Sequence, residues 1–139
     1  MAVLSVLGIL GMLGIYGFTT ATDRADEGAS QHAVRSVVVA EQLRYQNRGA
    51  FTDDPLALAG LEPSWSYVTV ADGPGEVSVS TGRHQDMEAV AVAAWSEGRC
   101  VGAVAFDPEL AETITSRWDP ASGSCSGADA FTNAGESSW

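Results

Sequence analysis

The feature that most constrains the fold is a run of apolar residues at the start of the chain. No charged side chain occurs between Met1 and Thr22, whereas the remainder carries the whole formal net charge of −11. About 20 consecutive apolar residues make a helix long enough to cross the hydrocarbon core of a bilayer. The sequence therefore predicts a hydrophobic helix over residues 1–22, surrounded by lipid or by other apolar helices, and joined to a water-exposed remainder.

The start of this run differs from that of a secretory signal peptide, which normally opens with basic residues and ends at a small-residue cleavage site. No Lys or Arg precedes the apolar residues here. Our interpretation is that a short basic leader has been removed upstream of Met1. A cleaved secretory signal and a single-span membrane anchor are the alternatives.

Small residues recur along the apolar segment and indicate close helix packing. Four glycines stand at every third position: Gly8, Gly11, Gly14 and Gly17. With three residues between repeats and 3.6 residues per turn, they wind slowly around the helix. Small residues allow neighbouring backbones to approach closely where apolar helices pack against each other. We therefore expect these glycines to lie at contacts with other helices.

An amphipathic helix is predicted over residues 23–48. The stretch contains no Pro and only one Gly, and its apolar residues recur at helical spacing. They are Ala33, Val34, Val37, Val38, Ala40, Leu43 and Tyr45. Asn47 and Gly49 supply a stop signal. If this helix continues the apolar segment, about 45 residues would extend roughly 70 Å, as a stalk with a head.

The head, predicted to span residues 23–139 with this helix, contains a loop over residues 49–64 and then strand-like runs. Four runs are rich in β-formers or alternate apolar with polar residues: 65–71, 76–81, 88–95 and 99–106. Turn signals separate them at 72–75, 82–85 and 96–98. These spacings predict a four-stranded antiparallel β-meander over residues 65–106, with one face against the helix and the other in water. The Ser/Gly/Asp-rich region 107–139 reads as a C-terminal loop. The predicted fold class is α+β.

The two cysteines, Cys100 and Cys125, favour one disulfide that ties the C-terminal loop back to the last strand. A membrane-directed chain reaches an oxidising compartment, where such bonds form. Closing a loop of this length contributes about 3.5 kcal/mol in the chain-entropy model. Two buried free thiols are the alternative. Two cysteines without a nearby His pair do not make a metal site.

Composition argues against two classes of function. The chain has a pI near 4.3 and 7 Arg without Lys, which makes nucleic acid an unlikely partner, because phosphate binding depends on Lys and Arg contacts. We find no nucleophile motif, phosphate loop or metal cluster, so the chain is not expected to be an enzyme or to hold a cofactor. His32 and His84 are expected to face solvent. Two acidic pairs, Asp53-Asp54 and Asp86/Glu88, offer calcium ligands but are more typical of turns.

The order of these elements resembles that of type IV pilins and pseudopilins. The helix ends in AEQLRYQNRGAFTDDPLALAGLEPSWSYVTV, similar to the family's sequence of an aromatic residue, Asn and Gly, a second aromatic residue, a Leu-rich loop and a first strand. Gly14 falls where the family often has glycine, which implies Met1 as the processed, N-methylated first residue. Two positions depart from the family: Ser5 replaces its usual glutamate, and Thr22 its helix-bending proline. Without that glutamate, the amine of Met1 needs another partner, such as the Ser5 hydroxyl.

The resemblance implies a structural subunit of a type IV pilus-like filament on the cell surface, serving adhesion, motility or uptake. The implied partners are identical subunits, the cytoplasmic membrane before assembly, a prepilin peptidase and the assembly ATPase with its platform. The implied assembly residues are Met1, Ser5, Gly8, Gly11, Gly14 and Gly17. The alternative is a minor pilin or pseudopilin of a secretion or DNA-uptake system that acts as a binding or initiating module. Its candidate contacts are Trp65, Trp95, Trp118 and Trp139.

Overall fold

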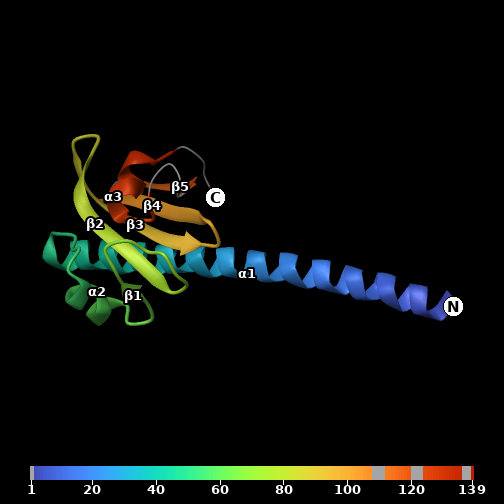
Figure 1. Ribbon diagram of the computed structural model, residues 1–139. Helices are drawn as coiled ribbons and strands as arrows, with labels where there is room; N and C mark the ends of the chain where they lie inside the picture. Colours follow the sequence, from blue (N-terminus) through green and yellow to red (C-terminus); the bar gives the residue numbers. More distant parts are fainter. Residues whose placement is uncertain (1, 108–111, 120–123, 136–138) are drawn as a thin grey trace.

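The computed structural model describes residues 2–107, 112–119, 124–135 and 139, and side chains from residue 25 onward within those ranges. It is an α+β structure in which a long helix runs under a sheet and projects beyond it (Figure 1). The elements are α1 (Ala2–Arg48), α2 (Pro55–Leu61), β1 (Ser66–Tyr67), β2 (Glu76–His84), β3 (Met87–Ser96), β4 (Arg99–Phe106), β5 (Thr113–Trp118) and α3 (Gly127–Thr132).

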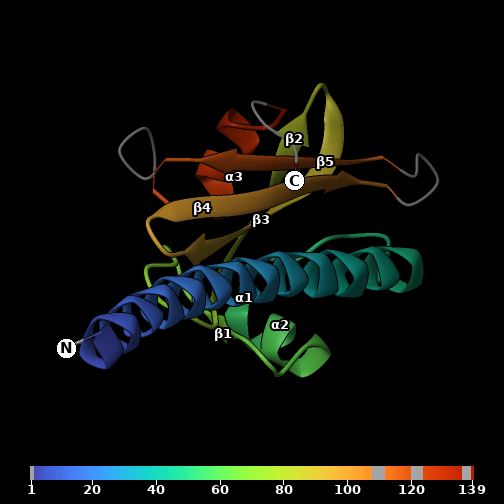
Figure 2. The same ribbon diagram turned by 90° about the vertical axis from the view of Figure 1, so that its right-hand side faces the viewer.

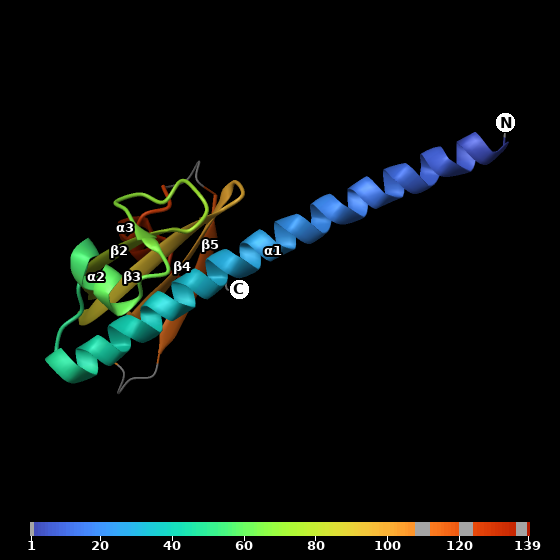
Figure 3. The ribbon, with the colours of Figure 1, turned by 90° about the horizontal axis from the view of Figure 1, so that it is seen from below.

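The apolar segment and the amphipathic segment form one helix. α1 has 47 residues, which at 1.5 Å per residue is about 70 Å of helix. Its second half lies along the sheet, and its first half projects away from the head (Figures 1 and 3). The helix ends where predicted: Gly49 has φ +71°, and its N–H donates to the Tyr45 carbonyl at 2.7 Å.

The sheet differs from the predicted four-stranded antiparallel meander. It has five strands in the order β1-β2-β3-β4-β5, and β1 pairs parallel to β2. The strand predicted over residues 65–71 is only Ser66–Tyr67. The Val68 N–H still donates to the Val77 carbonyl of β2 at 3.0 Å, but the Ala71 N–H donates to the carbonyl of Cys125, 2.9 Å away, and not to a strand.

The β2–β3 and β3–β4 hairpins turn on two-residue loops. The predicted turn at 96–98 is confirmed, since Glu97 and Gly98 have φ of 32° and 78° and connect β3 to β4. The turn predicted at 82–85 is wrong, because β2 continues through Gly82 to His84. The loop consists of Gln85 and Asp86, with φ of 51° and 66°. A two-residue loop of type I′ needs positive φ at both positions, and Gln85 is not a residue that signals it.

The region predicted as a C-terminal loop contains an edge strand and a short helix. β5 pairs with β4 over six positions, from Cys100–Trp118 to Ala105–Thr113. α3 is capped by Ser126, whose hydroxyl accepts from the Asp129 N–H at 3.1 Å. It lies on the face of the sheet opposite α1 (Figure 2).

The sheet is therefore covered on both sides, and the prediction that one face of the sheet is exposed to solvent is wrong. Alternate residues of β3 enter two different cores. Val90, Val92 and Ala94 pack with α1, whereas Ala89, Ala91 and Ala93 pack with Trp118 and Ala130. The small side chains on the second face leave room for α3 to lie close to the sheet. Because both faces of the sheet are covered, β3 and β4 are buried almost without alternation.

The predicted disulfide between Cys100 and Cys125 is confirmed, with Cα atoms 5.1 Å apart. Both residues are buried, and Trp118 stands opposite Cys100 on the neighbouring strand. The Trp118 indole N–H donates to the Ser124 carbonyl at 3.2 Å. The bridge and this hydrogen bond hold the segment that leads into α3 against the sheet.

Substituting Gly127 with Ala should test how tightly α3 fits. A Cβ there would lie 2.5 Å from the Ser80 nitrogen and 2.8 Å from the Ala91 carbonyl oxygen, so backbone must shift. We expect Gly127→Ala to lower the free energy of unfolding by about 1–3 kcal/mol in urea titrations. The matched control is Gly60→Ala in α2, where nothing lies within 4 Å; it should be neutral or stabilise by up to about 1 kcal/mol. Equal effects of the two substitutions would contradict the close fit.

Candidate assembly surface

The predicted assembly residues fall largely outside what the structure describes. Met1 lies outside the described residues. Ser5, Gly8, Gly11, Gly14 and Gly17 lie within the helical backbone of α1, and their side-chain surroundings are outside the described part. Their roles in helix packing stay predictions.

Across the residues with described side chains, which begin at Ala25, no helix combines the length and apolarity needed to cross a bilayer. The segment predicted to do so, residues 1–22, precedes that range.

Beside the head, α1 has a buried and an exposed face. Val34, Val37 and Val38 are at most 5% exposed and pack against the sheet. The opposite face presents Val39 and Leu43, one helical turn apart and each 54% exposed. Leu43, one of the apolar residues at helical spacing in the predicted amphipathic helix, is exposed. α1 thus has an exposed apolar strip in addition to its buried apolar face.

Glu41 is a buried carboxyl group on α1 that the sequence analysis did not single out. It is 0% exposed, and its Oε2 accepts a hydrogen bond from the Thr52 N–H at 2.8 Å. Burial raises its pKa above the usual value of 4.5, against the opposing effects of this hydrogen bond and of Arg44. Its spacing from Val34, Val37 and Val38 places it on the buried stripe of α1, a signal present in the sequence.

The polar contacts of Glu41 and Arg44 are incomplete. Glu41 Oε1 and Arg44 Nη1 are buried without a hydrogen-bond partner among the described residues. They stand one helical turn apart near the end of α1, where Tyr45 also stacks on Phe51 with ring centroids 4.5 Å apart. The group joins the end of α1 to the loop that follows it, so the direction of that loop is fixed by the helix.

The carboxylates of Asp53-Asp54, the first acidic pair considered as calcium ligands, accept hydrogen bonds from neighbouring residues. Asp54 caps α2 by accepting from the Leu56 N–H at 3.1 Å, and Asp53 accepts from the Thr81 hydroxyl at 3.1 Å. In the second pair, Asp86 belongs to the β2–β3 loop, and its carbonyl accepts from Arg83. Among the described residues no group of three or more His, Cys, Asp or Glu side chains could hold a metal ion.

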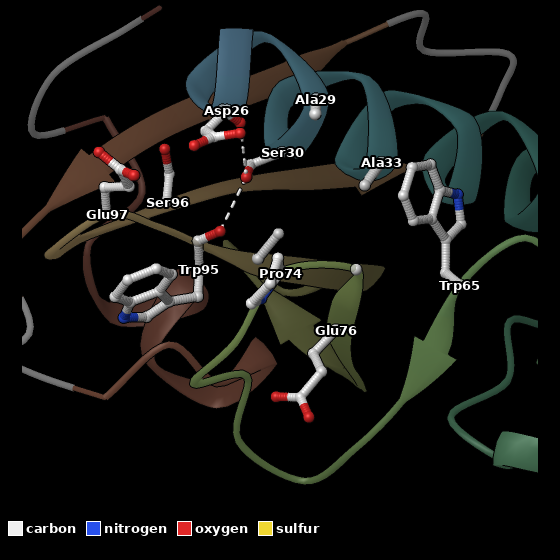
Figure 4. A pocket seen from close by; sticks show the side chains of 12 residues that line it. Asp26, Ala29, Ser30, Ala33, Trp65, Pro74, Glu76, Trp95, Ser96 and Glu97 are labelled. Atoms are coloured by element: carbon white, nitrogen blue, oxygen red, sulfur yellow. Dashed lines mark hydrogen bonds between the residues drawn. The ribbon is translucent and has the colours of Figure 1, made fainter. Parts of the chain in front are cut away.

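A pocket of about 270 Å³ lies where α1 leaves the head (Figure 4). Small residues of α1 and β3 form its floor, chiefly Ala29, Ala33 and Ala94, and the Trp65 ring closes one end. Ser30 bridges the helix to the strand, since its hydroxyl donates to the Trp95 carbonyl at 2.7 Å. The described residues that line the pocket include three with carboxylates, Asp26, Glu76 and Glu97, and none with a cationic side chain.

A second, polar pocket of about 300 Å³ adjoins it and is lined by both acidic and basic side chains. Within it the Arg117 guanidinium of β5 donates to the Glu27 carboxylate of α1. Both residues are about one third exposed, so this ion pair is partly screened by water. The contact nevertheless links the edge strand to the helix near the point where α1 leaves the sheet.

The histidines and tryptophans distribute differently from expectation. His32 is exposed as predicted, with its ring 6.2 Å from that of Trp65. His84 is half-buried against Phe106 and Phe131 at 5.8 and 6.3 Å, because α3 covers its side of the sheet. Of the four tryptophans only Trp118 is fully buried. Trp65, Trp95 and Trp139 are partly exposed.

Comparison with known proteins gives no family model that matches the chain and no significant match among curated proteins or solved structures. Its function is therefore inferred from its own residues and geometry.

Glu41 should make stability depend on pH in a defined direction. Because its pKa is raised by folding, the folded chain holds a proton that the unfolded chain loses near pH 4.5. The stability from this protonation is complete below that pH and is lost as pH rises through the raised pKa. Glu41→Gln keeps an oxygen for the Thr52 N–H but cannot ionise. Its stability relative to the native chain should therefore increase with pH in urea titrations between pH 4 and 8.

Glu41→Ala is the companion variant. It leaves the Thr52 N–H buried without an acceptor, which should lower the free energy of unfolding by about 1–3 kcal/mol at pH 4, and by less as pH rises and the native chain loses the stability from the Glu41 proton. A stability difference between Glu41→Gln and the native chain that stays constant with pH would show that the carboxyl does not titrate in this range.

Proposed function

We propose that this protein is a structural subunit of a type IV pilus-like surface filament, assembled through its apolar N-terminal helix. The observation that carries the proposal is the single continuous helix α1. The head packs on its second half, while its first half, uncharged in sequence, projects away (Figures 1 and 3). An apolar helix that its own domain does not cover needs apolar surroundings from elsewhere.

Two environments meet that need in turn. Before assembly, residues 1–22 are long enough to cross the cytoplasmic membrane. After assembly, the same residues pack against those of neighbouring copies, with Gly8, Gly11, Gly14 and Gly17 allowing close approach. A contact between two different surfaces of the same chain, repeated without closure, generates an open helical filament. The extended α1 offers such surfaces along its whole length.

The charge distribution supports the same orientation. Four Arg balance four acidic residues up to Arg48, so the entire net charge of −11 belongs to the chain beyond it. An acidic head remains in water, while the neutral helix is suited to burial. The implied partners are a prepilin peptidase and an assembly ATPase with its membrane platform, and the implied location is the cell surface.

Isolation of filaments tests the proposal. A host that carries a type IV pilus assembly system and produces the full chain should release, on shearing, filaments that an antibody against the head decorates in electron micrographs. Leu10→Lys places a charge within the apolar segment, at a cost of about 2.5–3.5 kcal/mol per helix, and should abolish them. Ala128→Lys, exposed on α3, is the control and should leave them intact. A native chain that stays in the membrane as a monomer would refute the proposal.

A further inference from the structure

The pocket where α1 leaves the head is shaped for side chains. Its volume of about 270 Å³ is below the roughly 300–1,000 Å³ typical of small-molecule sites. Its floor consists of the methyl groups of Ala29, Ala33 and Ala94, which offer no hydrogen bonds. Carboxylates line it and Arg side chains do not, among the described residues. An apolar occupant that carries a positive charge at its edge fits this lining.

The chain itself presents such an occupant on the outer face of α1. Arg35, Val39 and Leu43 are spaced by four residues and therefore stand in one row, which we call the outer ridge. Val39 and Leu43 are each 54% exposed. Arg35 is also exposed, and its guanidinium carbon lies 4.7 Å from the centre of the Trp139 ring. The ridge combines two exposed apolar side chains with a cation at one end.

We propose that the outer ridge of one copy inserts into the pocket of a neighbouring copy, with the two α1 helices parallel and shifted along their axes. The inference rests on the proposed filament, and it identifies the surfaces that join the heads. Ridge and pocket are 10–14 residues apart on the same helix, counted from Ala29 to Val39 and Leu43, or about 15–20 Å. Because they are different surfaces, each copy uses its ridge on one neighbour and its pocket on another.

Electrostatics favours this ridge over the other exposed leucines. Leu56 is 84% exposed and Leu61 42%, but both belong to α2. Acidic residues flank that helix: Asp53 and Asp54 precede it and Glu62 follows it. Seating α2 in a pocket lined by carboxylates would bring like charges together, which is destabilising. The outer ridge instead brings Arg35 toward those carboxylates.

Cysteine cross-linking of full-length filaments tests the contact. The double variant Ala29→Cys with Leu43→Cys places one thiol beside the pocket and one on the ridge. Under mild oxidation, sheared filaments should give a ladder of covalent multimers on a non-reducing gel. The matched control is Ala29→Cys with Leu56→Cys, whose second thiol is more exposed yet outside the ridge. It should give no ladder.

A charge on the ridge provides a second measurement. Leu43→Glu should lower the yield of filaments about tenfold or more, because it places a carboxylate in an acidic apolar pocket. Leu56→Glu should assemble as the native chain does.

The outcomes separate this inference from the proposed function. Native filaments without a ridge–pocket ladder, or with equal ladders in both double variants, would overturn the inference and assign the pocket to another occupant. They would leave the filament proposal standing. A native chain that forms no filaments would overturn both.

Discussion

The rest of the structure depends on the packing of the second half of α1 against the sheet. Val34, Val37 and Val38 enter one core with Val90 and Val92 of β3. Burial of each such side chain contributes about 1.5–3 kcal/mol, so the three valines of α1 together outweigh any single polar contact in the head. Their close packing leaves the helix one position on the sheet. The direction of the projecting half is consequently set by the head.

Polar contacts at three levels along the helix reinforce that position. Glu27 meets Arg117 of the edge strand, the Ser30 hydroxyl donates to the Trp95 carbonyl, and Glu41 accepts from Thr52. Each joins α1 to a different part of the head. A helix fixed at separated points resists rotation and sliding, which apolar contacts alone restrain less. A displacement of the projecting half must therefore move the head with it.

The parts of the fold that were predictable from sequence are those with local signals. Helical periodicity identified residues 23–48, and alternation or β-branched content located most of β2, β3 and β4. β1 was predicted too long, over residues 65–71, and β5 was not predicted, because short edge strands owe their pairing to tertiary contacts. Thr113–Trp118 also stands within a Ser/Gly/Asp-rich region that reads as a loop. α3 has only six residues, and it depends on the Ser126 cap and on the space left at Gly127.

For the candidate assembly surface, prediction from sequence was limited by contacts between distant segments. The burial of Glu41 could have been predicted from its helical spacing, but a charged residue on an apolar stripe is usually assumed to be solvated. The pocket could not be predicted from the sequence, because its walls come from α1, the β1–β2 connection and the β3–β4 hairpin. No spacing in the sequence indicates that Ala29 and Ala94 share a floor. The predicted assembly residues from Met1 to Gly17 remain predictions, since their proposed partners belong to other molecules.

Charge segregation restricts where neighbouring heads could touch in a filament. The chain beyond Arg48 carries the whole net charge of −11, so heads repel one another over a screening distance of about 8 Å at physiological salt. In the proposed filament, α1 offers a surface on which acidic and basic residues balance and apolar side chains remain exposed. Under this proposal, contacts along α1 would hold the heads close to the filament axis, while mutual repulsion would keep the acidic faces apart and hydrated. The same asymmetry of charge that marks the first 22 residues thus favours α1 over the acidic faces of the head as the surface for the proposed association.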